Sequence, residues 1–476
     1  MSIGKIDVTA ALKNVERTLR EDTSISPQLR AMMDLLVVII NLLLGKLGID
    51  SANSSTPPSQ DPHRQRGSTK KVSGQKRKPG GQNGHGGTNL KKEEKPDHIE
   101  TLKIDRRTIP AGPYTPLGFE SRQVIDIQIS KIVTEYRAEI VENASGRQFV
   151  AAFPPGVTRP VQYGNRIKAQ SVYMSQMQLI PYERVRDYFA DQCGIPISPG
   201  SVFNFNKEAF GLLETFESIV QGQLIRQELL HADETGININ GKLLWLHSAS
   251  NDRWTLFFPH THRGGEAMKA MGILDHFHGV LCHDHWKPYF KFNCVHALCN
   301  AHHLRELERA SEQDGQKWAK TLQSLLLEMN EATTQAGGRL SEMAADAFLH
   351  RYRDVLNQGE KECPPPDTTR RPGQRGRAAK SKSRNLLERL RDFETETLRF
   401  LTDPRVPFTN NQGENDIRMT KVQQKISGCF RSLEGAQIFC RVRSYLSTCR
   451  KHDVTPTDAL QKLFSGVLPD FLIKVE

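Results

Sequence analysis

The sequence predicts a multidomain α/β protein. Three apolar runs between residues 228 and 258 are separated by short turns, and two further strand-like runs follow at 279–284 and 294–299. Most of the remaining 476-residue chain carries helical periodicity, apart from a separate strand-rich stretch at 96–160. The composition, 37% hydrophobic and 25% charged, supplies enough apolar residues for several cores.

Two segments precede the strand-rich stretch. Residues 1–50 are predicted to be helical from position 6 to 47, with a break near Ser24–Pro27. The apolar stretch Leu35–Leu47 must be buried, and self-association and packing on the chain's own body explain it equally well. Residues 51–95 combine Gly, Pro, Ser and basic side chains, which predicts a linker that can lie along phosphates.

The net charge of +11 is concentrated in two short segments. Residues 61–81 hold seven basic side chains and one acidic one, and residues 363–384 hold the same balance. Such segments favour a polyanionic partner, most often nucleic acid, although solvated linkers have the same composition. We take Lys76, Arg77 and Lys78 as candidate DNA-binding residues.

Residues 96–160 are expected to form a small β module. Its strands are predicted from apolar alternation at 123–129 and 132–141 and from the run at 149–153. Residues 161–222 then turn helical, with Ser198 as a helix N-cap before Pro199. Three short helices with a glycine-containing turn suggest a helix-turn-helix DNA-binding region, although any small helical bundle has this pattern.

The three runs between 228 and 258 predict an antiparallel meander. Asn240-Gly241 between the first two runs is a strong hairpin signal, and Asn251-Asp252 makes the second turn. Asp233 interrupts the first strand. Because a charge in a half-buried strand is costly unless it is paired, we expect a cation or a metal near Asp233.

The remaining elements follow the meander in order. A helix at 265–274 leads to the strand at 279–284, which ends in Asp284, and then to the short strand at 294–299. Residues 311–401 are predicted to be a helical insertion within a domain that spans 223–450. Residues 451–476 are expected to form a C-terminal helical tail.

This order of elements matches a ribonuclease-H-like plan. In that plan the first and fourth strands are neighbours, so Asp233 and Asp284 would face each other near one end of the sheet. Glu414, on a late helix, can reach the same place. Three carboxylates suit Mg²⁺ or Mn²⁺, and a pair of such ions supports phosphodiester chemistry.

The helix that carries Glu414 also carries cations. Arg418, Lys421 and Lys425 follow Glu414 at intervals of four, three and four residues, which places all four on one helical face. We expect these three basic side chains to contact DNA phosphates beside the cleavage site.

Each acid also has a purely structural explanation. Asp233 could pair with a neighbouring cation, Asp284 could cap the turn before Trp286, and Glu414 could form a capping box with Asn411. The placement of two strand acids and one acid on a cationic helix favours the catalytic interpretation over three separate coincidences.

Several motifs, in this order, resemble the insertion-sequence-66 family of bacterial transposases. The resemblance covers most of the chain and implies a DDE transposase whose three acids are Asp233, Asp284 and Glu414, with an insertion between the last two. The matching stretches are Asn53–Ser59, Gly80–His85, Phe153–Gly164, Ala232–Thr235, Asp284 with Trp286 and Tyr289, Ala301–Arg305, Asn410–Arg418 and Ser427–Ser432.

Two stretches of the chain are candidates for a zinc-binding site, and neither has the expected ligand pattern. Many members of that family carry two CxxC pairs before the helical region, but residues 102–108 and 141–148 contain no cysteine here, so we expect no zinc there. A cluster of cysteines and histidines lies on both sides of Asp284 in the sequence, with spacing too irregular for a zinc signature. The cluster consists of Cys282, His283, His285, Cys294, His296, Cys299, His302 and His303.

The sequence therefore predicts a metal-dependent DNA transposase that uses Mg²⁺ or Mn²⁺, with two ions expected. DNA is the expected partner, along with a homo-oligomer on DNA and accessory proteins of the same element. A catalytically silent DNA-binding relative and a ribonuclease-H-like nuclease without strand transfer remain alternatives. No signal peptide is visible and no apolar run is long enough for a bilayer, so we expect a cytoplasmic protein without membrane contact.

Overall fold

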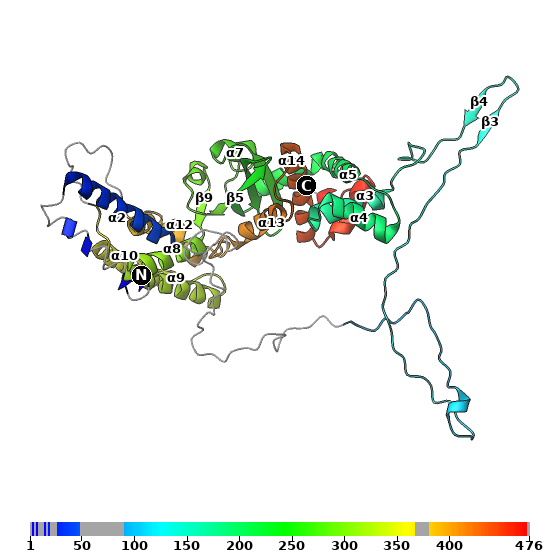
Figure 1. The fold of residues 1–476 in the computed structure, drawn as a ribbon, viewed down its shortest axis with the longest axis horizontal. Coiled ribbons are helices and arrows are strands. Elements are labelled where there is room, and N and C mark those ends of the chain that lie inside the picture. Colours follow the sequence, from blue (N-terminus) through cyan, green and yellow to red (C-terminus); the bar gives the residue numbers. More distant parts are fainter. Residues whose placement is uncertain are drawn as a thin grey trace.

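The computed structural model describes residues 2–3, 6–7, 14–15, 18–19, 26–47, 90–366 and 380–473. Its centre is a five-stranded sheet, with a group of helices beyond each edge (Figure 1). Helices α8, α9 and α10 lie at one end of this body, and helices α3, α4 and α5 lie at the other (Figure 1).

The central sheet is mixed, with the strand order β7-β6-β5-β8-β9. Strands β5, β6 and β7 are antiparallel neighbours, while β8 lies parallel to β5 and β9 parallel to β8. The predicted meander and the predicted pairing of the first and fourth strands are both confirmed. The strands span Leu229–Ile239 (β5), Lys242–Ser250 (β6), Thr255–His260 (β7), Val280–His283 (β8) and Val295–Leu298 (β9).

The hairpin between β5 and β6 has the geometry that its sequence predicts. Asn240 and Gly241 both have positive φ angles, 48° and 83°. A two-residue turn with both central residues in this region matches the twist of the flanking strands, and Asn-Gly is the pair that tolerates it best. The turn fixes the register of β5 on β6 and therefore the face on which each β5 side chain lies.

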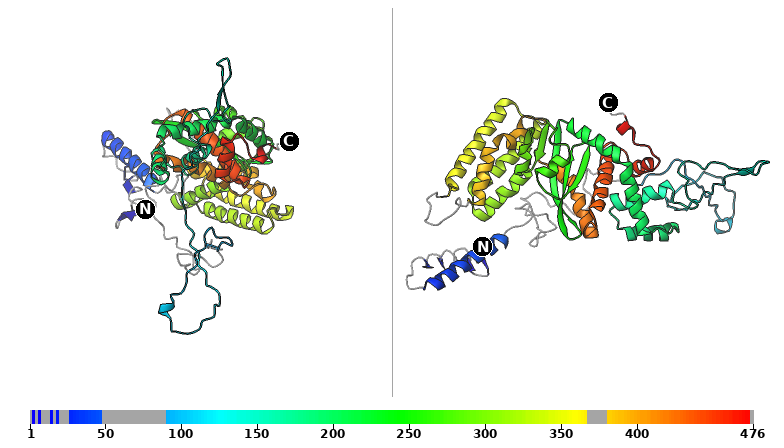
Figure 2. Two further views of the ribbon diagram at one scale, coloured as in Figure 1. Left: turned by 90° about the vertical axis from the view of Figure 1, so that its right-hand side faces the viewer. Right: turned by 90° about the horizontal axis from the view of Figure 1, so that it is seen from above.

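Two long helices cover one face of the sheet. Helix α13 (Asn411–Ser427) packs on β5 and β6, and helix α14 (Leu433–Lys451) packs on β7. Ile237 of β5, Ile417 of α13 and Phe439 of α14 meet in the core between them. Figure 2 shows both helices, in orange and red, running beside the sheet.

The predicted helical region at 161–222 is confirmed as helical. Helix α3 continues into a π-helical turn, and the Ser198 side chain caps α5 by accepting a hydrogen bond from the Ser201 N–H. The last predicted helix is divided at Leu213 into α5 and α6. The helices span Asn165–Val172 (α3), Tyr182–Cys193 (α4), Pro199–Leu212 (α5) and Glu214–Ile225 (α6).

One continuous core joins this helical region to the sheet and to the C-terminal helices. It contains Val202 of α5, Leu230 of β5, Tyr445 of α14 and Leu460 of α15 (Pro456–Phe464). The short helix α16 (Asp470–Ile473) adds Leu472. The predicted domain boundaries near 222 and 450 remain predictions, and the packing across them is uninterrupted.

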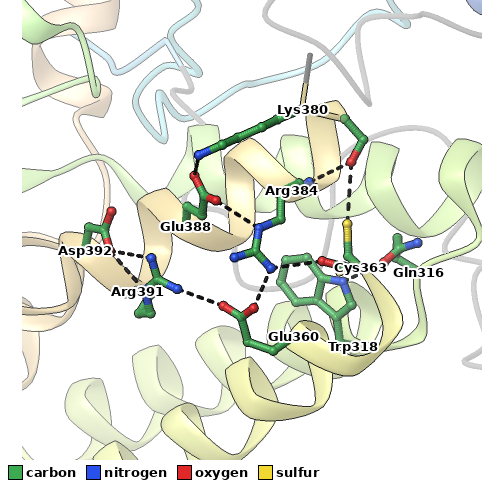
Figure 3. A network of polar contacts seen from close by, with 10 residues as sticks. Gln316, Trp318, Glu360, Cys363, Lys380, Arg384, Glu388, Arg391 and Asp392 are labelled. Carbon is green, nitrogen blue, oxygen red and sulfur yellow. Dashed lines mark hydrogen bonds and ion pairs between the residues drawn. The ribbon is translucent and has the colours of Figure 1, made fainter. Parts of the chain in front are cut away.

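The predicted insertion is helical and has its own core, in which Trp318 of α9 and Tyr352 of α10 are buried. Arg384 of α11 donates to Glu360 and to the Cys363 carbonyl oxygen of the α10 end, and so ties α10 to α11 (Figure 3). The helices span Asn300–Asp314 (α8), Lys317–Gln335 (α9), Glu342–Glu362 (α10), Lys382–Asp392 (α11) and Glu394–Leu398 (α12), followed by a 3-10 turn at Arg399–Leu401.

Two short elements connect the strands of the central sheet. Helix α7 (Gly265–Ala270) crosses from β7 to β8 and is shorter than the predicted helix at 265–274. A 3-10 turn, Lys287–Lys291, lies between β8 and β9. Tyr289 of this turn is buried, and its hydroxyl donates to Glu234 of β5.

The strand predictions for residues 96–160 are largely wrong. The structure forms one hairpin here, β3 (Ile140–Glu142) with β4 (Gln148–Val150), and the predicted strand at 123–129 has no sheet partner. No side chain from 96 to 160 is buried, so this stretch has no hydrophobic core of its own. Alternation alone predicts a strand only when another strand pairs with it and an apolar surface covers it.

The N-terminal prediction needs a correction as well. Ile6–Asp7 (β2) pairs antiparallel with Ser2–Ile3 (β1), so the helix does not begin at residue 6. Helix α2 spans Pro27–Leu47, after the predicted break, and exposes Leu35 and Leu36. The basic residues of 61–81 lie outside the described residues. Across the described parts of the chain, no helix combines the length and apolar character that a membrane crossing needs.

Candidate active site

The two strand acids lie next to each other at one end of the sheet. In the parallel pair of β5 and β8, His231 is opposite Cys282. Continuing that register by two residues places Asp233 beside Asp284, on the same face because side chains alternate with period two. Asp284 is the first residue after β8, so it lies where the strand opens into a loop. Asp233 and Asp284 are both partly accessible.

Helix α13 brings Glu414 to this end of the sheet, and Asn410 fixes where the helix begins. The Asn410 side-chain amide donates to the Ala232 carbonyl oxygen at 2.9 Å, and its Oδ1 lies 2.6 Å from His231 Nδ1. The Asn410 backbone N–H donates to Cys299 Sγ at 3.1 Å. The start of α13 is therefore bound both to β5 beside Asp233 and to the end of β9.

Glycine at position 413 is part of the same arrangement. A Cβ at Gly413 would lie 3.1 Å from Asn410 Oδ1 and 3.2 Å from its Nδ2, closer than nearly all side-chain contacts. A side chain at position 413 would therefore force the buried Asn410 amide to shift by a few tenths of an ångström. Glu414, the next residue, donates its backbone N–H to the Asn410 carbonyl oxygen at 3.1 Å.

The electrostatics of the site reflect crowded carboxylates. Burial raises the pKa of Asp233 well above its ordinary value, and the charges of Glu234, Asp284 and Glu414 raise it further. The Glu234 backbone N–H donates to Asp233 Oδ1 at 2.9 Å and opposes this shift. Since one unit of pKa corresponds to about 1.4 kcal/mol, the ionised form of Asp233 requires a positive partner.

The residues fit a hard divalent cation. Carboxylates are the ligands that Mg²⁺ and Mn²⁺ prefer, and three of them converge here from β5, the end of β8 and α13. Glu414 Oε1 is buried and has no hydrogen-bond partner, so one carboxylate oxygen is free to coordinate a cation. Ligand atoms of Cys299, His302 and Glu414 also lie within 4.8 Å of one another, which adds two softer groups beside the acid.

Of the purely structural explanations for the three acids, one is confirmed for Asp284 and those for Glu414 and Asp233 are not supported. Asp284 Oδ1 accepts from the Trp286 N–H at 2.9 Å, so this acid does cap the turn, and its second oxygen remains available. Glu414 forms no capping box, because Asn410 is the N-cap and the side chains make no cap hydrogen bond. Within the described ranges no ion pair involves Asp233, so the cation that its burial calls for is not supplied by a neighbouring side chain there.

A second polar network lies on the other face of β5, because Glu234 alternates with Asp233. The Glu234 carboxylate accepts from Arg263 at 2.7 and 3.1 Å and from the Tyr289 hydroxyl at 2.5 Å. The Arg263 guanidinium lies between two indole rings, 4.7 Å from Trp245 and 4.2 Å from Trp286. This network holds the loop after β7 and the loop after Asp284 against the same end of the sheet.

The cluster of cysteines and histidines does not converge into one zinc site. Among the described residues, only Cys299 and His302 of the eight join a group that could hold a metal, together with Glu414. His283 Nε2 lies 3.0 Å from His296 Nδ1. Burial raises the pKa of the Cys282 thiol well above its ordinary value, as for a small core residue.

The predicted DNA-binding residues of α13 lie in different environments. Arg418 and Lys425 are exposed, whereas Lys421 is half-buried and donates to the Gly236 carbonyl oxygen of β5 at 2.6 Å. Burial lowers the pKa of Lys421. Lys76, Arg77 and Lys78 lie outside the described residues.

Sequence reasoning missed several residues around the acids. His302 and Arg305 of α8 lie 3.8 Å and 3.6 Å from the Glu414 carboxylate, and Arg389 of α11 acts electrostatically on Asp284. The motif at 301–305 was visible but suggested no role for its side chains. Nothing in the sequence near Arg389 indicates that this side chain lies near Asp284, because its position depends on how α11 packs on α8.

Comparison with known proteins gives two matches. Residues 160–438 match the profile described as "Transposase IS66 family", which covers more than half of the chain. Residues 10–91 match a separate profile, described as a family of unknown function (DUF6444). No curated protein matches the chain.

Proposed function

Because the chain belongs to the IS66 family of transposases, we propose that it cleaves the ends of its mobile element by metal-dependent phosphodiester hydrolysis and joins the freed 3′ hydroxyl to target DNA. The observation that carries this proposal is the convergence of Asp233, Asp284 and Glu414 at one end of the sheet. Asp233 and Asp284 come from adjacent parallel strands, and Glu414 comes from the first turn of α13.

A ribonuclease-H-like core is part of the proposal. The sheet order β7-β6-β5-β8-β9, antiparallel for three strands and parallel for two, supports it. In such a core the acids gather where β5 and β8 lie side by side. The helical insertion between β9 and α13 then accounts for the long chain segment between Asp284 and Glu414.

The chemistry needs two balanced steps. First, a water oxygen attacks the phosphorus, the bond from phosphorus to the 3′ oxygen breaks, and that oxygen takes up a proton, which leaves a 3′ hydroxyl and a 5′ phosphate. Second, the 3′ hydroxyl oxygen attacks a target phosphorus while the target's own 3′ oxygen leaves with a proton. The number of phosphodiester bonds is unchanged in the second step.

In this reaction some residues of the chain would hold the metal ions, and others would position the residues that do so. Asp233, Asp284 and Glu414 would hold one or two Mg²⁺ or Mn²⁺ ions. Such ions, when bound, activate an attacking oxygen and stabilise the charge on a leaving oxygen. Asn410 binds the Ala232 carbonyl oxygen and so holds the start of α13, with Glu414, beside Asp233. The hydrogen bonds of Arg263 and Tyr289 to Glu234 keep the loop after Asp284 in place.

DNA contacts are proposed for three parts of the chain. On α13, Arg418 and Lys425 are exposed and free to reach phosphates, while Lys421 donates to the Gly236 carbonyl oxygen of β5. The helices of residues 161–222 are the second part, and the basic segment with Lys76, Arg77 and Lys78 is the third. Assembly of several copies on DNA is implied by the family resemblance and stays a prediction.

The test is cleavage of labelled element-end DNA with Mg²⁺ by the intact protein and by Asp233→Asn, Asp284→Asn and Glu414→Gln. We expect cleavage by the intact protein and at least a 100-fold loss in each variant, with DNA binding retained. Asp416→Asn, two residues beyond Glu414 and paired with Lys451, is the control variant for changes in α13.

The other outcomes separate the alternatives. An intact protein that binds element ends but cuts none of them, under all metal conditions, would favour a catalytically silent DNA-binding relative. Cleavage without joined products on a target plasmid would favour a nuclease without strand transfer. A variant of one acid that still cleaves normally would show that this acid is structural.

A further inference from the structure

Four buried polar atoms beside the acids have no hydrogen-bond partner. They are His285 Nε2, His302 Nδ1, Arg389 Nε and Glu414 Oε1. His302 Nδ1 and Glu414 Oε1 are 3.8 Å apart, and the Arg389 charge acts on His285, His302 and Asp284. Because buried polar groups are nearly always hydrogen-bonded, a concentration of unpaired ones indicates the place of a ligand.

Arg389 comes to this place from the helical insertion. Helix α11 packs against α8, and the Arg389 guanidinium forms an ion pair with Glu306 of α8. Phe393, one turn further along the insertion, packs its ring 4.4 Å from the ring of His285. The insertion is thus in direct contact with the loop that carries Asp284.

The chemistry of Arg389 fits an anion. A guanidinium carries several N–H donors in a plane and binds phosphate oxygens well, and its Nε–H here is buried and unused. Only Glu306 pairs with it among the described residues, and the Glu306 side chain remains 36% exposed. The anion that the proposed reaction brings beside Asp284 is the phosphate at the cleavage site.

We propose that Arg389, carried to the acids by the insertion, binds a non-bridging oxygen of the phosphate that is cut. This inference rests on the proposed function. In this role Arg389 is a catalytic residue, since it touches the reacting group and stabilises the negative charge that grows on it as the phosphorus–oxygen bond breaks. The insertion would then complete the active site by supplying this one side chain.

The experiment compares Arg389→Gln with two matched controls in the full-length protein. Arg391→Gln changes a half-exposed arginine of the same helix, which pairs with Glu360 and Asp392 away from the acids (Figure 3). Glu306→Gln removes the partner of Arg389 but keeps the guanidinium. We expect cleavage of element-end DNA to fall about 100-fold in Arg389→Gln and to stay within threefold of the intact protein in both controls.

Binding gives a readout that does not depend on cleavage. In Ca²⁺, element-end DNA is compared with the same DNA carrying an uncharged methylphosphonate at the cut position. The intact protein, Arg391→Gln and Glu306→Gln should lose about tenfold in affinity for the modified DNA, whereas Arg389→Gln should lose less than threefold. A smaller loss in Arg389→Gln alone means that its guanidinium senses this phosphate.

The opposing results are equally clear. If Arg389→Gln and Glu306→Gln lose activity and melting temperature together, the ion pair is structural and the inference is wrong. It is also wrong if the methylphosphonate costs Arg389→Gln as much affinity as it costs the intact protein. Failure of the acid variants to affect cleavage would overturn the proposed function, and the binding comparison would still decide the role of Arg389.

Discussion

Single residues decide how accurately the acids are placed, and Asn410 is the main example. Its buried side chain joins the start of α13 to His231 and to the Ala232 carbonyl oxygen, next to Asp233. An amide can donate and accept at once, so one side chain satisfies both a carbonyl oxygen and a ring nitrogen. No apolar residue could replace it without leaving buried polar groups unpaired.

Replacing Asn410 should lower stability and cleavage together. Asn410→Ala removes both side-chain hydrogen bonds and leaves two buried groups unsatisfied, so we expect the free energy of unfolding to fall by roughly 2–4 kcal/mol. Urea denaturation measures this loss. Asn415→Ala, at an exposed asparagine of the same helix, should change stability by less than about 0.5 kcal/mol. Equal effects at the two positions would contradict the anchoring role.

His247 should make stability depend on pH. Burial lowers the pKa of His247 from about 6.5 to about 4, so the folded protein favours the neutral ring. The full stability of the folded protein is present above pH 6.5, where His247 is neutral in the unfolded state as well. Stability is lost as pH falls from 6.5 toward 4, because only the unfolded state then binds a proton at this ring. From the difference in pKa we expect about 2 kcal/mol of lost stability from this residue between pH 7.5 and pH 5.

The measurement is the unfolding free energy at both pH values for the intact protein and His247→Gln. The variant should lose about 2 kcal/mol less on acidification, because it has no ring to protonate. His350→Gln, at an exposed histidine of α10, should follow the intact protein. The assignment fails if His247→Gln and the intact protein lose the same stability.

At the scale of elements, α13 both presents a candidate catalytic acid and attaches itself to the sheet. Its first turn presents Glu414, and its middle is attached to β5 through the bond from Lys421 Nζ to the Gly236 carbonyl oxygen. The chain after α13 returns to the same strand. The Asn240 N–H donates to the Phe430 carbonyl oxygen at 2.9 Å, and the Phe430 N–H donates to the Asn238 carbonyl oxygen at 2.9 Å. The helix is therefore held to β5 at both ends and in the middle.

Lys421 and Lys425 should respond differently to removal. Lys421→Ala deletes a charged hydrogen bond to a backbone carbonyl group and should cost about 1–2 kcal/mol of stability. Lys425→Ala should leave stability nearly unchanged and reduce the salt dependence of DNA binding by about one phosphate contact. Thermal unfolding and DNA titrations at several salt concentrations test both. A larger stability loss in Lys425→Ala would reverse these roles.

At the scale of the whole molecule, the two largest hydrophobic cores of the described residues divide the body. One core joins helices α3 to α6, the sheet and the C-terminal helices, and the other lies within the insertion and touches the sheet through Val280 and Ala297. The acids lie where these cores meet, beside β8. Motion of the insertion relative to the sheet would therefore change the distances between the acids and the residues of the insertion.

Mutations in the two cores should have separate effects on local stability. Leu460 of α15 and Leu322 of α9 are each fully buried, and replacement by Ala should cost about 3 kcal/mol in either case. Hydrogen exchange should show faster opening of α3 and α5 in Leu460→Ala, and of α9 to α11 in Leu322→Ala. Uniform acceleration throughout the chain in both variants would mean that the two cores unfold as one unit.

The sequence alone determined the central sheet, and it predicted which three acids would form the site. Asn240-Gly241 fixes a tight hairpin because few other residue pairs adopt two successive positive φ angles, and this local rule does not depend on the rest of the chain. Apolar alternation predicted the meander, and the family resemblance implied the proposed roles of Asp233, Asp284 and Glu414. These predictions rest on short-range geometry or on motifs.

Only the tertiary structure decided the surroundings of the acids. Arg389 comes near Asp284 because α11 folds back on α8, and Lys421 donates a hydrogen bond to Gly236 because β5 lies beside α13. Residues 123–129 alternate as well as any strand of the sheet, yet no strand pairs with them. Contacts between distant segments depend on which surfaces meet on folding, and a pattern along one segment does not contain that information.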